Sequence, residues 1–512
     1  MEHHEVKHQK GISAPVKILF AILLVAELAA SVFFMLALVK LNLLQTWQIL
    51  LAGGVLAILF IINTCVLIVR KKGVVSKVLS AILAILAIGA CILGSKYVRT
   101  ATSFIETATG SKYETQAYKV VTLTSSIYDD IDTLRGQRIG FLSSNPNISN
   151  TKAALKKTIG YKEASYEELG NLISALYEQD AAGIVLNDSY LDYLYEESDD
   201  TTINFAEETR VIYEFEVRAD IEDIHDEVDI TTEPFIIYVS GSDSRGAISQ
   251  TARSDVNIVV AVNPKTNKIL LVSIPRDYYV QLHGTTGTLD KLTHAGVYGI
   301  EMSKNTIEDL LGIKINYTVK VGFQAVKQIV DAIDGIDIDS DQALSIRGED
   351  GTMCNIQQGK NHLNGACALR YSRERHSYTT GDRHRGQNQQ QVLTKIIQKI
   401  TDLHYATRWP QILEAAKGTF ETSLTYDEIT NFARLELATL KKWSIESIQL
   451  DGTGSSQPTY SMGSRPLYVM IPNQATVDNA KAKITETLAD PVVEEPEETE
   501  EDSAQTEAPS EE

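Results

Sequence analysis

The sequence has few of the residues that build metal centres and nucleotide sites. It holds four cysteines in 512 residues, with no CxxC pair and no histidine-rich stretch, so nothing predicts a transition-metal site. The polar part of the chain also lacks a Walker A motif and any other glycine-rich nucleotide loop. These absences argue against transition-metal chemistry and against an ATP-dependent reaction.

Hydrophobic residues are concentrated at the N-terminal end. Three apolar runs, Val16–Val39, Gln48–Val69 and Val78–Leu93, each approach the roughly 20 residues that a helix needs to cross a bilayer. Residues 1–95 are therefore predicted to form a cytoplasmic arm and three membrane spans. Glu27 lies inside the first run, which favours a contact between helices, with a proton site as the alternative.

Basic residues predict the orientation of these spans. Lysine and arginine gather in the N-terminal arm and in the second loop, whereas the first loop has only Lys40. The positive-inside rule then places everything after about Ser95 outside the cell. In that compartment Cys354 and Cys367 are able to form a disulfide, with two free thiols as the alternative. The arm is too short for a nucleic-acid-binding segment, so no nucleic-acid partner is expected.

The polar part divides into two predicted α/β units. After a connector at 96–117, residues 118–218 predict a small accessory α/β domain with no convergent reactive residues, and a charged linker follows at 219–233. The second and larger unit covers 234–488. Residues 489–512 predict a disordered tail, because Asp490–Glu512 holds eleven carboxylates and no basic residue. Much of the formal net charge of −20 therefore lies outside the folded parts.

Three predicted strands of the larger unit carry charged residues at one end. These strands are Phe235–Val239, Arg253–Val262 and Lys268–Pro275, and a hairpin turn joins the last two. Because a hairpin pair is antiparallel, the start of one strand lies beside the end of the other. Four charged residues are therefore expected at one sheet edge: Arg253, Asp255, Arg276 and Asp277. Asp243 joins them if the first strand runs parallel to the third.

Arginine is concentrated in Ala368–Gln391, against the sign of the whole chain. The five arginines there are Arg370, Arg373, Arg375, Arg383 and Arg385. Guanidinium groups bind phosphate oxygens in pairs, which predicts a pyrophosphate site, and a salt-bridged surface loop is the alternative. A helix is predicted to begin near Arg385 and to present Gln389 one turn later on the same face. The polar loop Gly452–Gly463 is expected to border the site.

Asp243 and Asp255 have the character of ligands for Mg²⁺ or Mn²⁺. Mg²⁺ is usually held by one or two carboxylates and completes its coordination with water and phosphate oxygens. Such an ion and the arginines together would neutralise the charge on a leaving phosphate, which phosphoryl transfer requires. Simple pairing of each aspartate with a neighbouring arginine is the structural alternative.

Six motifs occur in the order found in one family. They read GSDSR, RSD, SIPRD, DKLTHAG, ALRYSRER and GDRHRGQNQQQ, between about Pro234 and Leu403. In these motifs the chain resembles the LytR-CpsA-Psr (LCP) family of Gram-positive cell-wall proteins. Three membrane spans and an accessory domain further resemble its capsule-associated branch.

The resemblance implies an extracellular α-β-α sandwich at 234–488 that acts as a phosphotransferase. Such proteins move a glycopolymer from a polyprenyl-pyrophosphate carrier to peptidoglycan, through a phosphodiester at the C6 hydroxyl of N-acetylmuramic acid, and release polyprenyl phosphate. Their lipid chain lies in an apolar tunnel between sheet and helices. Membrane lipid and capsule or wall-polymer assembly proteins are the further partners implied.

The family's functional residues carry over position by position. Asp243 and Asp255 match the magnesium-associated aspartates. The matching pyrophosphate-binding arginines, three of which are also expected to be catalytic, are Arg276, Arg373, Arg375 and Arg385. Further substrate-binding positions fall on Arg253, Asp382 and Gln389.

Two departures from the family and two other functions are weighed beside this reading. Asp334–Gly335 stands where two glycines are common, which is expected to alter a turn near the substrate, and His294 has no assigned role. A non-catalytic scaffold or regulator would bind phosphorylated wall polymers through the same arginines. A hydrolase would cleave the lipid pyrophosphate with water as the acceptor.

Overall fold

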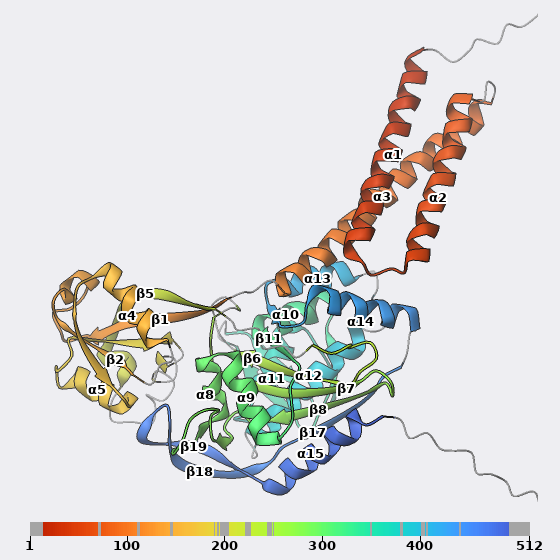
Figure 1. Cartoon of the computed structure of the whole chain (residues 1–512). Helices are drawn as coiled ribbons and strands as arrows, with labels where there is room; N and C mark the ends of the chain where they lie inside the picture. The colour runs from red at the N-terminus through yellow and green to blue at the C-terminus, as the bar shows by residue number, and fades with distance from the viewer. Residues whose placement is uncertain are drawn as a thin grey trace, which may run out of the picture.

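The computed structural model describes most of the chain between Ala14 and Asp490 (Figure 1). The predicted arm before Ala14 and the predicted tail from residue 491 lie outside the described residues. The described residues are 14–69, 73–109, 113–143, 147–188, 190–191, 194, 204–220, 227–242, 248, 250–348, 351–378, 382–400, 405, 408–439 and 442–490.

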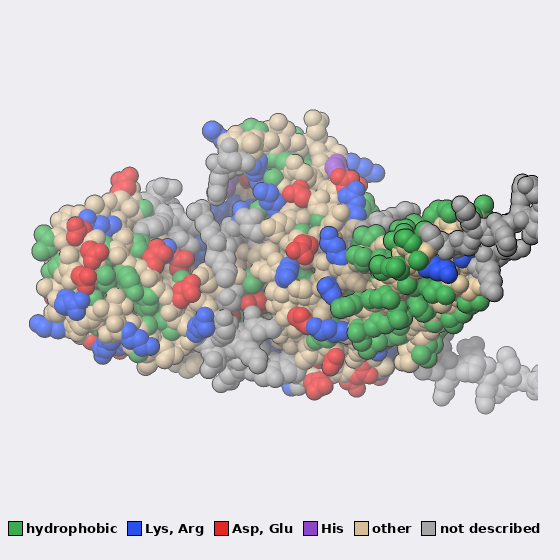
Figure 2. All heavy atoms as spheres, turned by 90° about the horizontal axis from the view of Figure 1, so that it is seen from above, with side chains coloured by type: hydrophobic (Ala, Val, Ile, Leu, Met, Phe, Trp, Pro, Cys, Tyr) green, Lys and Arg blue, Asp and Glu red, His purple; other side chains and the backbone are tan. Residues whose placement is uncertain are grey.

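Three long helices project from the rest of the molecule (Figure 1). They are α1 (Ala14–Leu41), α2 (Thr46–Thr64), which continues as a π-helical turn over Cys65–Val69, and α3 (Val74–Ala108). All three are long and apolar enough to cross a membrane, as predicted. Apolar side chains cover their outer surface, which is the green region of Figure 2.

A buried polar chain ties the three membrane-capable helices together. Asn63 of α2 donates its Nδ2 to Glu27 Oε1 of α1 at 2.8 Å, and Ser80 of α3 donates its hydroxyl to Asn63 Oδ1 at 2.7 Å. Polar groups at membrane depth need partners within the protein because lipid offers none. Glu27 therefore makes the helix contact that the sequence favoured.

The third helix extends well beyond its apolar run and joins the anchor to the globular part. Much of the predicted connector is the last part of α3, which ends at Ala108. The Phe104 ring meets Phe420 edge-on, with 6.4 Å between centroids. Near the end of α1, the Tyr426 hydroxyl donates to the Leu41 carbonyl at 3.2 Å. These contacts fix the globular part close to the outer end of the anchor.

Residues 113–220 form a five-stranded sheet with the order β3-β2-β4-β1-β5. Its strands are β1 (Tyr113–Leu123), β2 (Arg138–Leu142), β3 (Lys162–Tyr166), β4 (Gly183–Asn187) and β5 (Thr209–Asp220). Helix α4 (Ile148–Thr158) covers one face through Leu155, and α5 (Leu169–Tyr177) covers the other through Leu172. The short helical segments Ile131–Leu134 (η2) and Phe205–Glu208 (α7) lie in its connections. Sequence analysis missed β3, because its polar and charged residues lack the apolar alternation of a strand.

The larger unit is built on a six-stranded sheet with the order β16-β11-β6-β7-β8-β17. Its strands are β6 (Phe235–Ser242), β7 (Val256–Asn263), β8 (Lys268–Ile274), β11 (Tyr317–Gly322), β16 (Phe420–Thr422) and β17 (Ser444–Gln449). β7 is antiparallel to both β6 and β8, so β6 and β8 run parallel to each other. The β7–β8 hairpin is the one that the sequence predicted.

Helices cover both faces of this sheet, which gives the predicted α-β-α arrangement. On one face, α9 (Ile300–Leu311) and α15 (Gln474–Leu488) pack on the inward side chains of β6, β7 and β8. On the other face lie α12 (Asp382–Ile400) and α14 (Tyr426–Thr439). A third core joins α10 (Phe323–Ala332), α11 (Gly365–Arg373) and α13 (Trp409–Ala416) to α12.

Short strands complete the larger unit. They are β9 (Tyr279–Val280), β10 (Asp290–Lys291), β12 (Ile336–Ser340), β13 (Leu344–Arg347), β14 (Met353–Ile356), β15 (Gly359–Leu363), β18 (Gly452–Thr459) and β19 (Gly463–Pro472), with the short helices α8 (Leu292–Ala295) and η4 (Gly296–Tyr298). The predicted loop Gly452–Gly463 is wrong: most of it is β18, paired antiparallel with β19. The prediction failed because β18 consists largely of glycine, serine and threonine, which are typical of loops. Its partner β19 supplies the buried apolar side chains Leu467 and Val469.

The two α/β units are docked through a buried ion pair. Lys320 of β11 donates to Glu114 of β1 at 3.0 Å, with both side chains almost entirely buried. Glu114 also accepts from the backbone N–H of Ile300 at the start of α9. Val297 and Met462 of the larger unit enter the hydrophobic core of the smaller one. The first sheet is therefore attached to the second by both charge and apolar burial.

We predict that replacing Lys320 by methionine lowers the free energy of unfolding by about 3 kcal/mol, because Glu114 is left buried without its cation. Adding Glu114→Gln to the same chain should restore much of the loss. Urea unfolding of the two single variants and the double variant measures the coupling. Additive losses would show that the pair does not hold the units together.

Candidate active site

The site is built where three neighbouring strands present the same end. β6 and β8 finish there, at Ser242 and Ile274, and β7 begins there at Val256. Asp255 precedes β7, and its backbone N–H donates to the Gly241 carbonyl of β6 at 2.9 Å. The parallel course of β6 and β8 meets the condition under which Asp243 was expected at this edge. Asp243 itself lies outside the described residues.

A buried ion pair joins the two strand ends. Arg276 Nη1 donates to Asp255 Oδ1 at 2.8 Å, with side chains 15% and 11% exposed. Thr293 donates its hydroxyl to the same carboxylate oxygen at 3.4 Å. Asp277 lies beside Arg276 at 3.6 Å and pairs with Lys291 at 3.3 Å. Asp277 therefore anchors this corner to β10.

Positive charge surrounds Asp255 on several sides. Burial alone would raise its pKa, but the charges of Arg276, Arg253 and Arg385 and the hydrogen bond from Arg276 together hold its pKa below the ordinary value. Ionised Asp255 therefore stabilises the fold at neutral pH, and this contribution is lost as the pH falls through the lowered pKa. Charged residues next to β7 and β8 and on α12 therefore all act on the ionisation of Asp255.

Helix α12 reaches this corner because one of its residues has no side chain. A Cβ on Gly386 would lie 2.5 Å from Gln449 Nε2 and 3.5 Å from Ser273 Oγ, at the ends of β17 and β8. The close approach leaves Arg385 buried at the sheet end. Gln389, half-buried, lies one turn further along the same helix face. Asp382 opens α12, and its side chain lies outside the described residues.

The end of α11 brings two more arginines toward the start of α12. Asn388 of α12 donates its Nδ2 to the Tyr371 carbonyl at 3.1 Å, which joins the two helices. Arg373 ends α11 just beyond this junction, and burial lowers its pKa to about 10, so it stays cationic at neutral pH. Arg375 follows, half-buried, with its Nε donating to the His376 ring at 3.4 Å.

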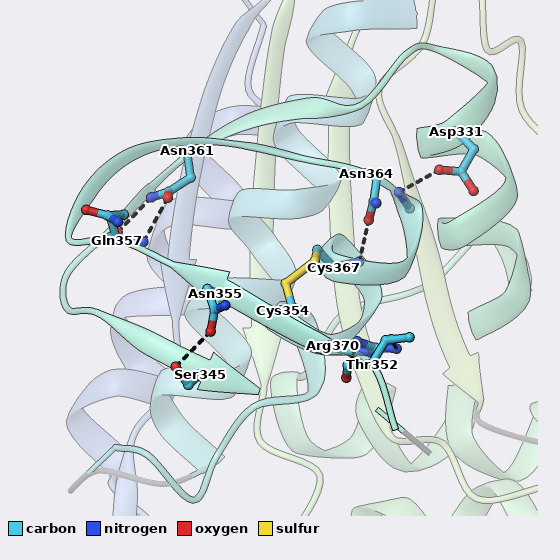
Figure 3. Close-up of a disulfide and its surroundings, with 11 residues drawn as sticks. Asp331, Ser345, Thr352, Cys354, Asn355, Gln357, Asn361, Asn364, Cys367 and Arg370 are labelled. Atoms are coloured by element: carbon cyan, nitrogen blue, oxygen red, sulfur yellow. Dashed lines mark hydrogen bonds between the residues drawn. A yellow bond between two sulfur atoms is a disulfide. The ribbon is translucent and has the colours of Figure 1, made fainter. Parts of the chain in front are cut away.

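A disulfide fastens the other end of α11 (Figure 3). Cys354 of β14 is bonded to Cys367 of α11, so of the two states left open, the bonded one is present. Arg370 points toward the β14 hairpin, where it donates to the Thr352 carbonyl at 3.1 Å and to its hydroxyl at 2.8 Å. Arg370 therefore binds the hairpin, whereas Arg385 of the same cluster lies close enough to Asp255 to lower its pKa.

Relatives of known name share this domain. A family model described as the LytR_cpsA_psr family matches residues 194–484, which is more than half of the chain. The chain belongs to this family. The predicted family is thereby confirmed, and the capsule-associated branch stays a prediction.

Two relatives carry the name polyisoprenyl-teichoic acid–peptidoglycan teichoic acid transferase TagU. The protein from Enterococcus faecalis is 35% identical over 228 residues, which cover 44% of this chain and 72% of that protein. The protein from Bacillus anthracis is 35% identical over 224 residues, covering 44% and 71%. The crystal structure of B. subtilis TagV aligns over 51% of this chain and 98% of that one, with 27% identity and a TM-score of 0.43.

The donor set of this LCP domain is compatible with a magnesium ion. Asp255 offers one carboxylate among the guanidinium groups of Arg276, Arg253 and Arg385, and Asp243 follows directly after the last described residue of β6. One or two carboxylates are what Mg²⁺ takes from a protein when phosphate supplies other ligands. Among the described residues no group of three or more His, Cys, Asp or Glu side chains forms a metal cage.

Both departures from the family pattern have structural explanations. Asp334 and Gly335 adopt φ of +63° and +77° between α10 and β12, a conformation that glycine takes freely and aspartate tolerates. Their carbonyls accept from Lys399, which is roughly 20 Å along α12 from Arg385. The expectation that this turn lies near the substrate stays a prediction.

His294 is also structural. Its Nδ1 lies 2.6 Å from Asp290 and 3.0 Å from the Ser461 hydroxyl, and all three side chains are buried. The contact joins α8 to the chain between β18 and β19, beside the first α/β unit. Sequence reading missed this and the roles of Thr293 and Lys291, although DKLTHAG marks the segment that carries them.

We predict that Arg276→Gln changes how stability depends on pH. At pH 7 the variant should be about 3 kcal/mol less stable, because a buried carboxylate loses its hydrogen-bonded cation. The difference should shrink as the pH falls, because the folded variant, with Asp255 buried and its cation removed, takes up a proton at a higher pH than the folded wild type does. Urea unfolding from pH 3 to 7 measures it, with Asp255→Asn as the control whose profile should be flatter. A difference that stays constant with pH would contradict the pairing.

Proposed function

We propose that this protein transfers a cell-wall glycopolymer from a polyisoprenyl-pyrophosphate carrier to peptidoglycan. The observation that carries the proposal is the Asp255–Arg276 pair at the sheet end, with Arg253 and Arg385 close enough to lower the pKa of the same carboxylate. Two named relatives are teichoic acid transferases that act on peptidoglycan, which supports the same reaction class. The chain is then an enzyme rather than a scaffold.

The reaction is a phosphoryl transfer. An acceptor hydroxyl of peptidoglycan attacks the phosphorus that carries the glycopolymer, and the phosphoanhydride bond to the polyisoprenyl phosphate breaks. Polyisoprenyl phosphate leaves with the electron pair of that bond, and the hydroxyl proton passes to a base. Guanidinium groups that contact the diphosphate stabilise the charge that grows on the leaving phosphate.

Each arginine has a place in this scheme. Arg276, which follows β8, and Arg385 of α12 would bind the diphosphate next to Asp255. Arg373 and Arg375, at the end of α11, would bind the outer oxygens, while Arg253 balances the charge of Asp255. Asp382 and Gln389 are proposed as further polar contacts on α12. The base is proposed to be Asp243 or Asp255.

A magnesium ion would be held by Asp243 and Asp255. The ion would supply positive charge opposite the arginines, next to the phosphate oxygens. Asp255 suits a ligand role because the surrounding cations keep it ionised. Its hydrogen bonds from Arg276 and Thr293 fix the orientation of the carboxylate before any substrate arrives.

The sheet offers a path for the lipid chain beside these charges. Four apolar side chains on the face toward α12 and α14 are only half-buried: Ile237, Val239, Val260 and Val319. Ile237 pairs with Val260, and Val239 pairs with Val319, across neighbouring strands, so the four side chains form one patch. Along β6 this patch lies a few residues before the charged end of the sheet. A polyisoprenyl chain lying on this patch would place its diphosphate among the arginines.

The membrane anchor is consistent with such a substrate. Three membrane-capable helices hold the domain, and the positive-inside pattern of the sequence supports the proposal that the domain lies on the outer side. The capsule-associated branch and the C6 hydroxyl of N-acetylmuramic acid are proposed as the polymer class and the acceptor.

We predict that Arg385→Gln and Arg375→Gln each lower the transfer rate by about 100-fold or more, because each removes a cation that acts on the leaving phosphate. Arg370→Gln is the matched control and should keep the rate, since Arg370 binds the Thr352 hairpin. The assay supplies lipid-linked polymer and peptidoglycan and detects the phosphodiester-linked product by mass spectrometry.

Two outcomes would oppose the proposal. Equal loss in all three variants would mean that the loss reflects folding, which circular dichroism of each variant checks. Release of free polymer without a peptidoglycan adduct would mean hydrolysis instead of transfer.

A further inference from the structure

A groove runs along the anchor where it meets the globular part. Its volume is about 760 Å³, and it lies between α1, α3 and α13. The part of the groove farther from the globular domain is apolar, and its wall is built from Ala26, Ala29, Ala30, Phe33, Ile88 and Ile92. These residues lie within the two membrane-capable helices α1 and α3. This apolar part of the groove therefore faces lipid and not water.

The end of the same groove next to the globular domain is cationic. Lys96 and Arg99 follow Ile88 and Ile92 on one face of α3, since these positions are three to four residues apart. Lys417, just after α13, completes the rim and donates to the Ser103 hydroxyl at 2.7 Å. Figure 2 shows lysine and arginine side chains along the border between the green apolar surface of the anchor and the globular part.

Charge at this rim is unbalanced. Lys96, Arg99 and Lys417 face a single acid, Glu414. Lys96 and Arg99 are exposed, and neither forms an ion pair with another described residue. By contrast, Lys40 at a similar height pairs with Glu106 at 3.0 Å. The excess of about two positive charges lies next to the apolar part of the groove. This arrangement fits a lipid with an anionic head group and an apolar chain.

We propose that this groove binds the polyisoprenyl phosphate of the outer leaflet, as a second lipid site apart from the arginine cluster at the sheet end. A phosphomonoester carries close to two negative charges at neutral pH, which matches the excess at the rim, whereas a phosphodiester phospholipid carries one. The small side chains of Ala26, Ala29 and Ala30 leave the space that the chain occupies. This inference rests on the proposed function, whose reaction releases this lipid phosphate.

Position also favours this occupant. The distance along α3 from Ile88 to Ser95 is about 10 Å, which corresponds to most of the apolar depth of one leaflet. The groove then opens at α13, whose residues Ile412 and Ala416 belong to the same core as α11 and α12. A lipid held there is next to the domain that uses it.

The test is photolabelling of the full-length protein in phosphatidylcholine nanodiscs, with a diazirine-bearing polyisoprenyl phosphate as the probe. Labelled peptides from α1 and α3 are expected. The double variant Lys96→Gln/Arg99→Gln should lose about tenfold or more of this labelling, because two contacts to the phosphate are removed. Lys40→Gln, at a similar height but outside the groove, should label like the wild type.

A steric variant tests the apolar half. Ala29→Phe fills the groove and should reduce labelling several-fold, while Ala21→Phe, on α1 but not among the groove residues, should not. Unlabelled polyisoprenyl phosphate should compete, and the same excess of phosphatidylglycerol should not. Equal labelling of groove and control variants would overturn the proposal, as would equal competition by phosphatidylglycerol, which indicates a general surface for anionic lipids.

A parallel experiment separates this inference from the proposed function. Arg385→Gln should abolish transfer and leave the α1 and α3 labelling intact, which supports two separate sites. Loss of both signals in that variant would mean that one site explains both, and would overturn the second site. If no variant or wild-type chain transfers polymer while the groove labelling still depends on Lys96 and Arg99, the proposed function fails and the lipid site stands.

Discussion

The structure of this LCP domain depends on keeping several arginines together at one end of a sheet. Like charges repel, and burial makes each of them more costly. Asp255 offsets part of that cost, since it accepts from Arg276 and lies close to Arg253 and Arg385. The carboxylate is held by the backbone bond to Gly241 and by Thr293. Removal of this anion would take away the carboxylate that accepts from Arg276, and Asp277, 3.6 Å from Arg276, would remain.

On the proposed function, the arginines near the sheet end would bind the diphosphate. Besides the arginines beside Asp255, one of them on α12, helix α11 contributes Arg373 at its end. The fold fixes those helices by other means: the Asn388–Tyr371 hydrogen bond, the close approach of Gly386 and the disulfide at Cys367. These contacts are made within the protein, so they do not require a bound anion to position the two helices.

Sequence patterns predicted the sheet but not how helices meet its end. The β7–β8 hairpin and a helix near Arg385, observed from Asp382, follow from apolar runs and helical spacing, which are local. The direction of Arg370 was not predictable, because it depends on a hairpin that sequence reading did not find. β18 was missed for a similar reason, since its partner β19 supplies the burial. The motifs named the site residues, while their distances needed the tertiary structure.

The same limit applies to the anchor. Hydropathy predicted three spans, and the connector after the third was expected to begin as a helix, as α3 does to Ala108. The packing of this polar part on Phe420 was not predicted. The groove at this junction is formed by residues far apart in the chain, such as Phe33, Arg99 and Lys417. Neither helix alone shows it. The contacts with Phe420 and Leu41 hold the LCP domain next to its membrane-capable helices.

The central claim is that the sheet end binds a diphosphate. A crystal structure of the protein with a polyisoprenyl diphosphate tests it most directly. The account predicts phosphate oxygens within hydrogen-bond distance of Arg276 and Arg385, with the chain lying on the patch of Ile237 and Val260. A diphosphate bound away from those two guanidinium groups, with the Asp255–Arg276 pair undisturbed, would contradict it.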